Sequence, residues 1–427
     1  MTAQHAHTTP VPQPRGGGDD PLLEAADPVE TARAHVAASA LTASPGGRVG
    51  LEMEYHLVDL RLPARRPDWA TVQRLAGSIG PLPSGSAVTL EPGGQIELST
   101  PPTDDVVSSV AALRADQGVL RGRLREQGFG AAPLGTDLAR PVRRVNPHQR
   151  YQAMEQHFDA LGHAGSGEAM MSATAALQVN VDAGPEAGWQ DRLSLVRSMV
   201  PMLVAASASS PYIAGGSSGW HSMRQGCWDG IDHGRSDPIA AGEPTEAWAA
   251  YALDAPLMLV RDDDGFSPVT GRVTFGDWLR GEGPVGRRPG VADLDYHLTT
   301  LFPPVRPRGY LEIRCIDALP DRWWPALTAI TVTLLDDPVA ADRAAELCAP
   351  VEGAWHLAAH HGLADPAIAT AVTGCLELAA DRSPEGLKPE VEAFVELVAS
   401  GSSPSQEIRR RVEAVGPLAT LQEESVA

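Results

Sequence analysis

The sequence predicts an α+β fold, in which an antiparallel sheet is combined with a largely separate set of helices. Four stretches alternate apolar and polar residues, as strands with two different faces do. Between residues 86 and 102, two strands flank a Gly93-Gly94 turn, which indicates an antiparallel hairpin. From about residue 320 to the end, the pattern is instead helical and rich in Ala and Leu.

The composition excludes several classes of protein. Hydrophobic residues make up 43% and charged residues 21% of the 427, which is ordinary for a globular chain. A net charge of -20 argues against nucleic-acid and membrane partners, because both need basic surface. The first twenty residues lack the apolar core of a signal peptide, and no apolar run has the length of a membrane span. Cys227, Cys315, Cys348 and Cys375 form no CxxC pair, so a cytoplasmic protein with reduced thiols is expected.

Taken in order, the chain divides into a tail and one folded region. Residues 1–20, rich in Pro, Gly, Thr and His, are expected to be disordered. Residues 21–427 are expected to form a single domain whose C-terminal portion, from about 320, is helical. Before that portion, helices are predicted at 27–41, 71–75, 104–127, 147–161, 185–210 (kinked at Pro201) and 274–279. Strands are predicted at 51–60, within 86–102, and at 173–184, 256–260 and 309–317, and residues 209–230 are predicted to be a functional loop.

The first of these strands carries an unusual pair of acids. Leu51, Met53 and Tyr55 share one face, and Glu52 and Glu54 share the other. Two carboxylates side by side on a strand repel each other, so something should compensate their charge. A divalent cation would do so.

Three later strands have the same character, which suggests one continuous polar surface. A solvated sheet face is the simpler explanation, but such a face normally mixes Thr, Lys, Arg and Ser, whereas this one is dominated by Glu and amides. Mg²⁺ takes oxygen ligands and often substrate phosphates, so two or three ions could bind here, bridged by ATP. The polar pairs on these strands are Gln95/Glu97, Gln178/Asn180 and Glu312/Arg314.

Arg314 adds a cation to this acidic surface. Arg314 either forms a structural ion pair with a neighbouring acid or stabilises a phosphoryl group during its transfer. The chain has no GxxxxGK[ST] motif, and Lys388 is its only lysine. An ATP site would therefore rely on metal, Arg and backbone N–H groups.

Two weaker patterns have ordinary explanations. His356 and His360 have zinc-ligand spacing, but no Glu follows His356 and the surroundings are Ala rich, so packing is the better interpretation. Cys227 lies in the predicted loop without the residues that would activate a nucleophile.

Five motifs in order, VGLEMEYHLVD, TLEPGGQIELSTPP, ALQVNVD, SMRQGCWDGID and HLTTLFPPVRPRGYLEIRCID, resemble those of glutamate–cysteine ligases of the plant and proteobacterial type. The resemblance runs from about residue 48 to 320. The tail and the Ala/Arg/Gly bias are similar to family members that begin ergothioneine synthesis. The resemblance implies a glutamine-synthetase-like fold, with a curved antiparallel sheet forming a funnel and helices packed on its outer face. It also implies that ATP phosphorylates the γ-carboxylate of L-glutamate and that the amine of L-cysteine then displaces phosphate.

The resemblance also implies roles for individual residues. Arg314 and Glu312 would be catalytic, with Arg314 facing the γ-phosphate beside Gln178 and Asn180, which help to hold metal and nucleotide. The implied Mg²⁺ ligands are Glu52, Glu54, Glu91, Glu97 and Glu312. The implied substrate-binding residues are Arg224 and Trp228 for glutamate, Arg306 for a substrate carboxylate, and Tyr296 and Thr300 for cysteine.

The chain departs from the plant pattern in one respect, and two other functions remain open. Lysines that plant members carry near Arg150, Tyr151 and Met154 are absent, and plant-type disulfide control is not supported. One alternative is a related carboxylate–amine ligase with a different amine acceptor. The other is a catalytically silent protein that binds glutamate or nucleotide, which the complete acidic set argues against.

Overall fold

The structure is a computed structural model that describes residues 20–262 and 265–427. The predicted tail lies outside the described residues except for Asp20, whose carboxylate caps the first helix and accepts a hydrogen bond from the Val291 N–H at 3.0 Å. The strands are β1 (Val49–Asp59), β2 (Ala87–Leu90), β3 (Ile96–Ser99), β4 (Phe129–Ala132), β5 (Ala176–Val181), β6 (Tyr212–Ile213), β7 (Gly216–Ser217), β8 (Leu259–Asp262), β9 (Gly265–Pro268), β10 (Val305–Pro307) and β11 (Leu311–Asp317).

The α-helices alternate with the strands in the first three quarters of the chain and then follow one another without strands. The first group is α1 (Pro21–Glu24), α2 (Pro28–Ala40), α3 (Trp69–Ile79), α4 (Val106–Glu126), α5 (Gln149–Ala160), α6 (Ala164–Ala173), α7 (Trp189–Ser207), α8 (Met223–Asp229), α9 (His233–Ser236), α10 (Pro244–Asp254), α11 (Phe275–Leu279) and α12 (Val291–Leu298). The second group is α13 (Trp324–Asp336), α14 (Pro338–Cys348), α15 (Trp355–His361), α16 (Pro366–Arg382), α17 (Lys388–Ala399), α18 (Pro404–Val415) and α19 (Pro417–Glu424).

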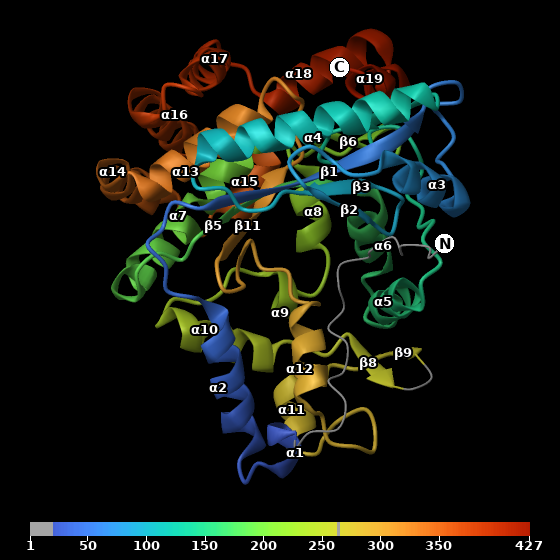
Figure 1. The fold of residues 1–427 in the computed structure, drawn as a ribbon, viewed down its shortest axis with the longest axis vertical. Coiled ribbons are helices and arrows are strands. Elements are labelled where there is room, and N and C mark those ends of the chain that lie inside the picture. The colour runs from blue at the N-terminus through green and yellow to red at the C-terminus, as the bar shows by residue number, and fades with distance from the viewer. Residues whose placement is uncertain (1–19, 263–264) are drawn as a thin grey trace.

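A seven-stranded antiparallel sheet forms the centre of the molecule, in the order β10-β11-β5-β1-β3-β2, with β4 paired to the end of β1. One face of this sheet is apolar: Leu51, Met53 and Tyr55 on β1 are fully buried. The helices α4, α7 and α13 contact this sheet, and α13 is buried along almost its whole length. Figure 1 shows α4 and the C-terminal helices above the sheet, with α2, α10, α11 and α12 in a lower layer. The predicted α+β class is confirmed.

The predicted hairpin at the Gly93-Gly94 pair is present, and both glycines are needed. Gly94 has a φ of +82°, a conformation that L side chains rarely adopt. A Cβ on Gly93 would lie 2.1 Å from the carbonyl oxygen of Ser172, so only glycine allows the turn to approach the end of α6 this closely. The turn thereby fixes the position of Glu91 and Glu97 on either side of it.

Some elements differ from the sequence prediction. Residues 209–230 are not one loop, because they contain the short β6–β7 hairpin and α8, a helix whose N-terminus is capped by the Ser222 hydroxyl. The helix predicted over 185–210 starts later, because α7 begins at Trp189; it contains Pro201 and ends at Ser207. The short strands β4 and β10 and the helices α6, α10 and α12 were not predicted, because their brief patterns do not separate them from loops.

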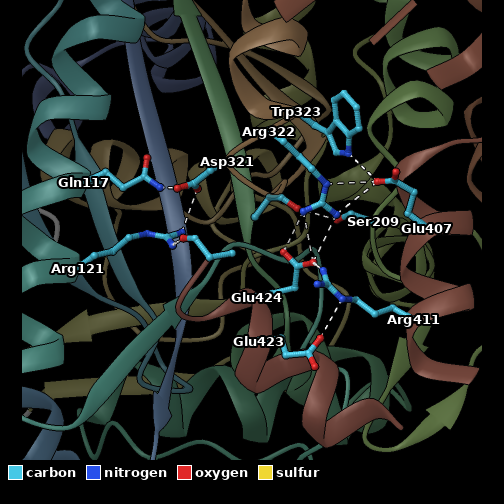
Figure 2. Close-up of polar contacts among 12 residues, drawn as sticks. Gln117, Arg121, Ser209, Asp321, Arg322, Trp323, Glu407, Arg411, Glu423 and Glu424 are labelled. Atoms are coloured by element: carbon cyan, nitrogen blue, oxygen red, sulfur yellow. Dashed lines mark hydrogen bonds and ion pairs between the residues drawn. The ribbon is translucent and has the colours of Figure 1, made fainter. Parts of the chain in front are cut away.

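The last two helices are fastened to the rest of the fold by a network of ion pairs. Figure 2 shows Arg322 and Arg411 converging on Glu424, with nitrogen–oxygen distances of 3.4 and 2.5 Å, while Arg322 also contacts Glu407 at 3.3 Å. A surface hollow of about 550 Å³ lies beside this network and is lined by Arg322, Glu407, Arg410 and Arg411. Three of these four lining residues are arginines, two of which, Arg322 and Arg411, are paired with acids of the network.

Within the described residues, no single helix has both the length and the apolar character needed to cross a membrane. One strongly bent helix pair, Trp355–Ala364 with Pro366–Arg382, meets the length and composition criteria only when the two are taken together.

Candidate active site

The polar face of the sheet brings the predicted acids and amides together across neighbouring strands. Glu54 on β1 lies directly opposite Glu97 on β3. Glu52 lies opposite Gln178 on β5, and Glu312 on β11 lies opposite Asn180 on β5. Four strands that are far apart in the sequence therefore contribute to one surface, as the alternation predicted.

The acids on β1 and β3 repel each other in this arrangement. Burial, followed by the charges of Glu97 and Glu312, raises the pKa of Glu52 to about 7. Burial and the charge of Glu54 raise the pKa of Glu97 to about 7, and the pKa of Glu54 is also raised, chiefly by burial. At neutral pH, Glu52 and Glu97 are therefore only partly ionised, and full ionisation of this part of the sheet would need a compensating positive charge.

Hydrogen bonds hold these carboxylates in fixed orientations. The amide nitrogen of Asn180 donates to Glu52 Oε1 at 3.0 Å, and the Ala176 N–H donates to Glu54 Oε2 at 2.8 Å. The hydroxyl of Thr89 donates to Glu97 Oε1 at 2.6 Å. These partners leave other carboxylate oxygens available to a ligand, because each carboxylate can accept several bonds.

Glu91, at the mouth of the hairpin turn, belongs to the same electrostatic group. Burial, with the charges of Glu97 and Glu54, raises its pKa well above the usual value. Its position beside the turn is the one that the sequence predicted.

Glu312 differs from the other acids because it is surrounded by arginines. Arg306 forms a bidentate pair with it, at 2.5 and 3.1 Å, and Arg308 and Arg314 contact it at 3.3 Å each. Although burial opposes ionisation, these cations lower the pKa of Glu312 to about 2. Arg306, predicted to bind a substrate carboxylate, is thus paired within the protein, and Glu312 would have to release an arginine to bind metal.

Arg314 stands at the junction between the acidic face and a small pocket. Its Nη1 donates to Gln178 Oε1 at 2.6 Å and lies 3.3 Å from Glu312 Oε2. The same side chain lines the pocket, together with Arg224 and Trp228 from α8.

The pocket is basic on one side and aromatic on the other. Arg224 is 3% exposed, and its guanidinium lies over the Trp228 ring, 6.0 Å from the ring centre. Phe302 packs against Trp228 with ring centres 5.2 Å apart, and Trp355 closes the pocket from α15. The pocket volume of about 20 Å³ fits a single water molecule, so a substrate would have to widen it.

Within the two described ranges, no three His, Cys, Asp or Glu side chains are arranged to hold a metal ion without movement. The chemistry of the donors nevertheless fits a hard cation. Glu52, Glu54 and Glu97 are oxygen donors on adjacent strands. Burial, with a smaller contribution from repulsion among the acids, raises their pKa values, so a bound cation would favour their ionised form.

Tyr296 and Thr300, predicted to bind cysteine, do not line the pocket of Arg224. Tyr296 is buried beneath the guanidinium groups of Arg150 and Arg261, 5.0 and 5.3 Å from its ring centre. Thr300 lies just after α12, and its hydroxyl donates to the His297 carbonyl at 2.7 Å.

The two weaker patterns have structural explanations, as expected. His356 and His360 pack edge-on against Trp220, and His356 contacts Asp229 at 3.3 Å. Cys227 is buried, and burial raises its thiol pKa to about 12, which opposes a nucleophilic role.

Sequence reasoning missed three residues of this site. Trp355 comes from the helical C-terminal portion, far beyond the recognisable motifs, and carries no local signal. Arg308 lies between the two predicted residues Arg306 and Glu312 but was given no role. Asp317 ends β11 after an irregularity in strand pairing between Ile313 and Ile316, so simple alternation could not assign its direction.

Comparisons with known proteins show the family to which the chain belongs. Residues 48–425 match the family described as Glutamate-cysteine ligase family 2 (GCS2). The chain is 48% identical to "Glutamate--cysteine ligase EgtA" of Mycolicibacterium smegmatis over 398 residues, covering 92% of this chain and 94% of the relative. It is 48% identical to the protein of the same name from Mycobacterium tuberculosis, covering 90% of each chain. A chloroplastic glutamate–cysteine ligase of Medicago truncatula is 32% identical over 67% of this chain and 57% of its own length.

Among solved structures, glutamate–cysteine ligase from Francisella tularensis in complex with AMP has a similar fold, with a TM-score of 0.57 at 13% identity, covering 90% of this chain and 88% of the other. The chain belongs to glutamate-cysteine ligase family 2.

Proposed function

We propose that this protein is an ATP-dependent ligase that joins the γ-carboxylate of L-glutamate to the amine of L-cysteine, releasing γ-glutamylcysteine, ADP and phosphate. The observation that carries the proposal is the position of Arg314, which borders both the acidic sheet face and the pocket of Arg224. A phosphoryl group bound on the acidic face could then meet a carboxylate bound in the pocket. The 48% identity to two mycobacterial glutamate–cysteine ligases supports the same reaction.

The reaction requires two displacements in one site. An oxygen of the glutamate γ-carboxylate attacks the γ-phosphorus of ATP, and the bond to ADP breaks, which gives γ-glutamyl phosphate. The cysteine amine then attacks the acyl carbon, loses a proton, and expels phosphate. Arg314 is suited to stabilise the charge that develops on the phosphoryl oxygens in the first step.

The acidic face is suited to hold Mg²⁺, and we propose two or three ions. Glu52, Glu54 and Glu97 are the main ligands in this proposal, with Glu91 and Glu312 as further oxygen donors. The bound metal would neutralise the phosphate charge of ATP. Gln178 and Asn180 lie on β5, between the acids of β1 and Arg314 of β11, and would orient the nucleotide phosphates.

The pocket is suited to glutamate. Arg224 is a buried cation with one terminal nitrogen that makes no hydrogen bond to the described residues, and the indole N–H of Trp228 is likewise without one. Two such donors favour a carboxylate ligand. Arg306 could bind a second carboxylate if glutamate displaced Glu312, and Tyr296 and Thr300 remain proposed, more distant contributors to the cysteine site.

We further propose that the product serves ergothioneine synthesis, as the similarity to the proteins named EgtA suggests. A cytoplasmic location and a single catalytic domain over residues 21–427 complete the proposal. The four cysteines are free and buried, in keeping with a reducing compartment.

The decisive experiment measures Mg²⁺-dependent ADP release from ATP with glutamate alone, with glutamate plus cysteine, and with other amines in place of cysteine. Product masses identify each reaction. Turnover that requires both glutamate and cysteine, with γ-glutamylcysteine as product, is expected. Turnover with another amine would move the protein to a related carboxylate–amine ligase, and ATP binding without turnover would favour a silent binding protein.

A further inference from the structure

A buried carboxylate, Asp317, lies behind the pocket and is bound by groups from two other segments. It is 1% exposed and sits at the end of β11. Its Oδ2 accepts hydrogen bonds from the Ser209 N–H at 3.0 Å and from the Ser210 hydroxyl at 2.7 Å. Its Oδ1 accepts a hydrogen bond from the Ser222 hydroxyl at 2.8 Å.

The hydroxyls of Ser210 and Ser222 connect Asp317 to the backbone of α8. Ser222 caps the helix, because its hydroxyl oxygen accepts from the Gln225 N–H at 3.3 Å. The hydroxyl oxygen of Ser210 accepts from the Arg224 N–H at 3.1 Å. Each hydroxyl has one hydrogen, which it donates to Asp317, so its lone pairs are directed at the first turn of α8.

Asp317 also acts on the Arg224 side chain. The guanidinium Nη2 donates to the Arg314 carbonyl at 2.8 Å, whereas Nη1 lies 3.9 Å from Asp317 Oδ1. At that distance the carboxylate balances the buried positive charge without occupying the Nη1 donor. Arg224 is therefore held in place and still has a donor for a ligand.

We propose that Asp317 is a positioning residue for the substrate carboxylate, acting through α8 and Arg224 and not by touching substrate. This inference rests on the proposed function, because it assigns glutamate to the Arg224 pocket. A purely structural role would affect both substrates alike, whereas a positioning role affects the ligand of Arg224 selectively.

The test compares Asp317→Asn with Asp321→Asn. Both Asp317 oxygens accept hydrogen bonds, so an amide with one acceptor oxygen would leave part of the set unpaired. Asp321 also accepts from an arginine, Arg121 at 3.0 Å (Figure 2), but it does not line the pocket. We expect Asp317→Asn to raise the KM for glutamate by about 10- to 100-fold, the range seen when a group that orients a metal-binding side chain is removed, while the KM for ATP stays within about threefold. Asp321→Asn should leave both constants near the wild-type values.

Hydrogen exchange of residues 209–229 provides a second readout that does not need turnover. Asp317→Asn should speed exchange in α8, and Asp321→Asn should not. If Asp317→Asn does not fold, Ser210→Ala tests the same connection, because it removes only one link and should also raise the glutamate KM selectively. Equal effects on glutamate and ATP, or unchanged exchange in α8, would overturn the inference. If the wild-type protein makes no γ-glutamylcysteine, the proposed function fails, while the exchange experiment still decides whether Asp317 orders α8.

Discussion

Replacing Glu97 by Gln is expected to stabilise the metal-free protein and to abolish its turnover. Glu97 is 7% exposed and lies directly opposite Glu54 on the neighbouring strand. The hydroxyls of Thr89 and Ser99 donate to its Oε1, at 2.6 and 3.1 Å. A glutamine has the same shape and can accept both bonds, so the substitution removes charge with little change in packing.

The magnitude follows from the pKa of this carboxyl, which is raised from 4.5 to about 7 in the folded protein. Each pKa unit corresponds to ~1.4 kcal/mol, so ionised Glu97 would cost the fold ~3 kcal/mol above pH 7. Glu54 shares in this repulsion, so we expect the variant to gain about 1–3 kcal/mol in unfolding free energy at pH 8. Because the folded-state pKa is raised, the stability contributed by protonated Glu97 is complete below pH 4.5 and is lost as the pH rises through about 7.

The assay is denaturant unfolding of protein in EDTA at pH 5 and pH 8, followed by thermal melting with and without Mg²⁺. The unfolding free energy of the variant should exceed that of the wild type at pH 8 and approach it at pH 5. Mg²⁺ should stabilise the wild type more than the variant. Glu126→Gln, on the exposed end of α4, is the matched control and should change neither stability nor turnover. A folded Glu97→Gln protein that is no more stable than the wild type at pH 8, or that retains full ADP release, would refute this reasoning.

Three further predictions follow from the same site. Arg224→Ala should raise the KM for glutamate by roughly 30-fold, since a charged hydrogen bond contributes about 2 kcal/mol, with a smaller effect on the KM for ATP; steady-state kinetics with each substrate varied would check this. Glu312→Gln should destabilise the fold by about 3–5 kcal/mol in urea unfolding, opposite in sign to Glu97→Gln, because it leaves the buried Arg306 without its partner; unchanged stability would contradict the role given to this pair. Gly93→Ala should displace the hairpin turn from the Ser172 carbonyl and reduce turnover, with faster hydrogen exchange in β2 and β3 as the measurable sign; native exchange with full activity would show that the turn tolerates a side chain.

The strands and their acids could be predicted because alternation along a strand is a local property. Glu52 and Glu54 point away from Leu51 and Met53 for reasons visible in five consecutive residues. No local sequence pattern shows whether a given acid is paired with arginines in the folded protein. Glu97 and Glu312 look alike in the sequence, yet the pKa of one is raised and that of the other lowered, because only Glu312 has three arginines within contact distance.

The pocket was harder to predict, because it is assembled from distant segments. Arg224 and Trp228 were found through a family motif, whereas the residues themselves suggested only a loop. Trp355 reaches the pocket from a helix that begins more than a hundred residues later, through packing that no local pattern encodes. Asp317 was hidden by the pairing irregularity in β11, since one shift in register reverses the expected direction of every later side chain.

The site therefore combines two sets of residues that tolerate substitution to different degrees. The acids stand on strands whose opposite faces form the core, so a substitution there disturbs both the chemistry and the folding of the sheet. The aromatic wall of Trp228, Phe302 and Trp355 comes from two short helices, α8 and α15, and one connecting segment, none of which pairs with the sheet's central strands. Natural selection or laboratory evolution could thus alter which carboxylate substrate is accepted by changing the wall, while the phosphoryl-transfer apparatus stays the same.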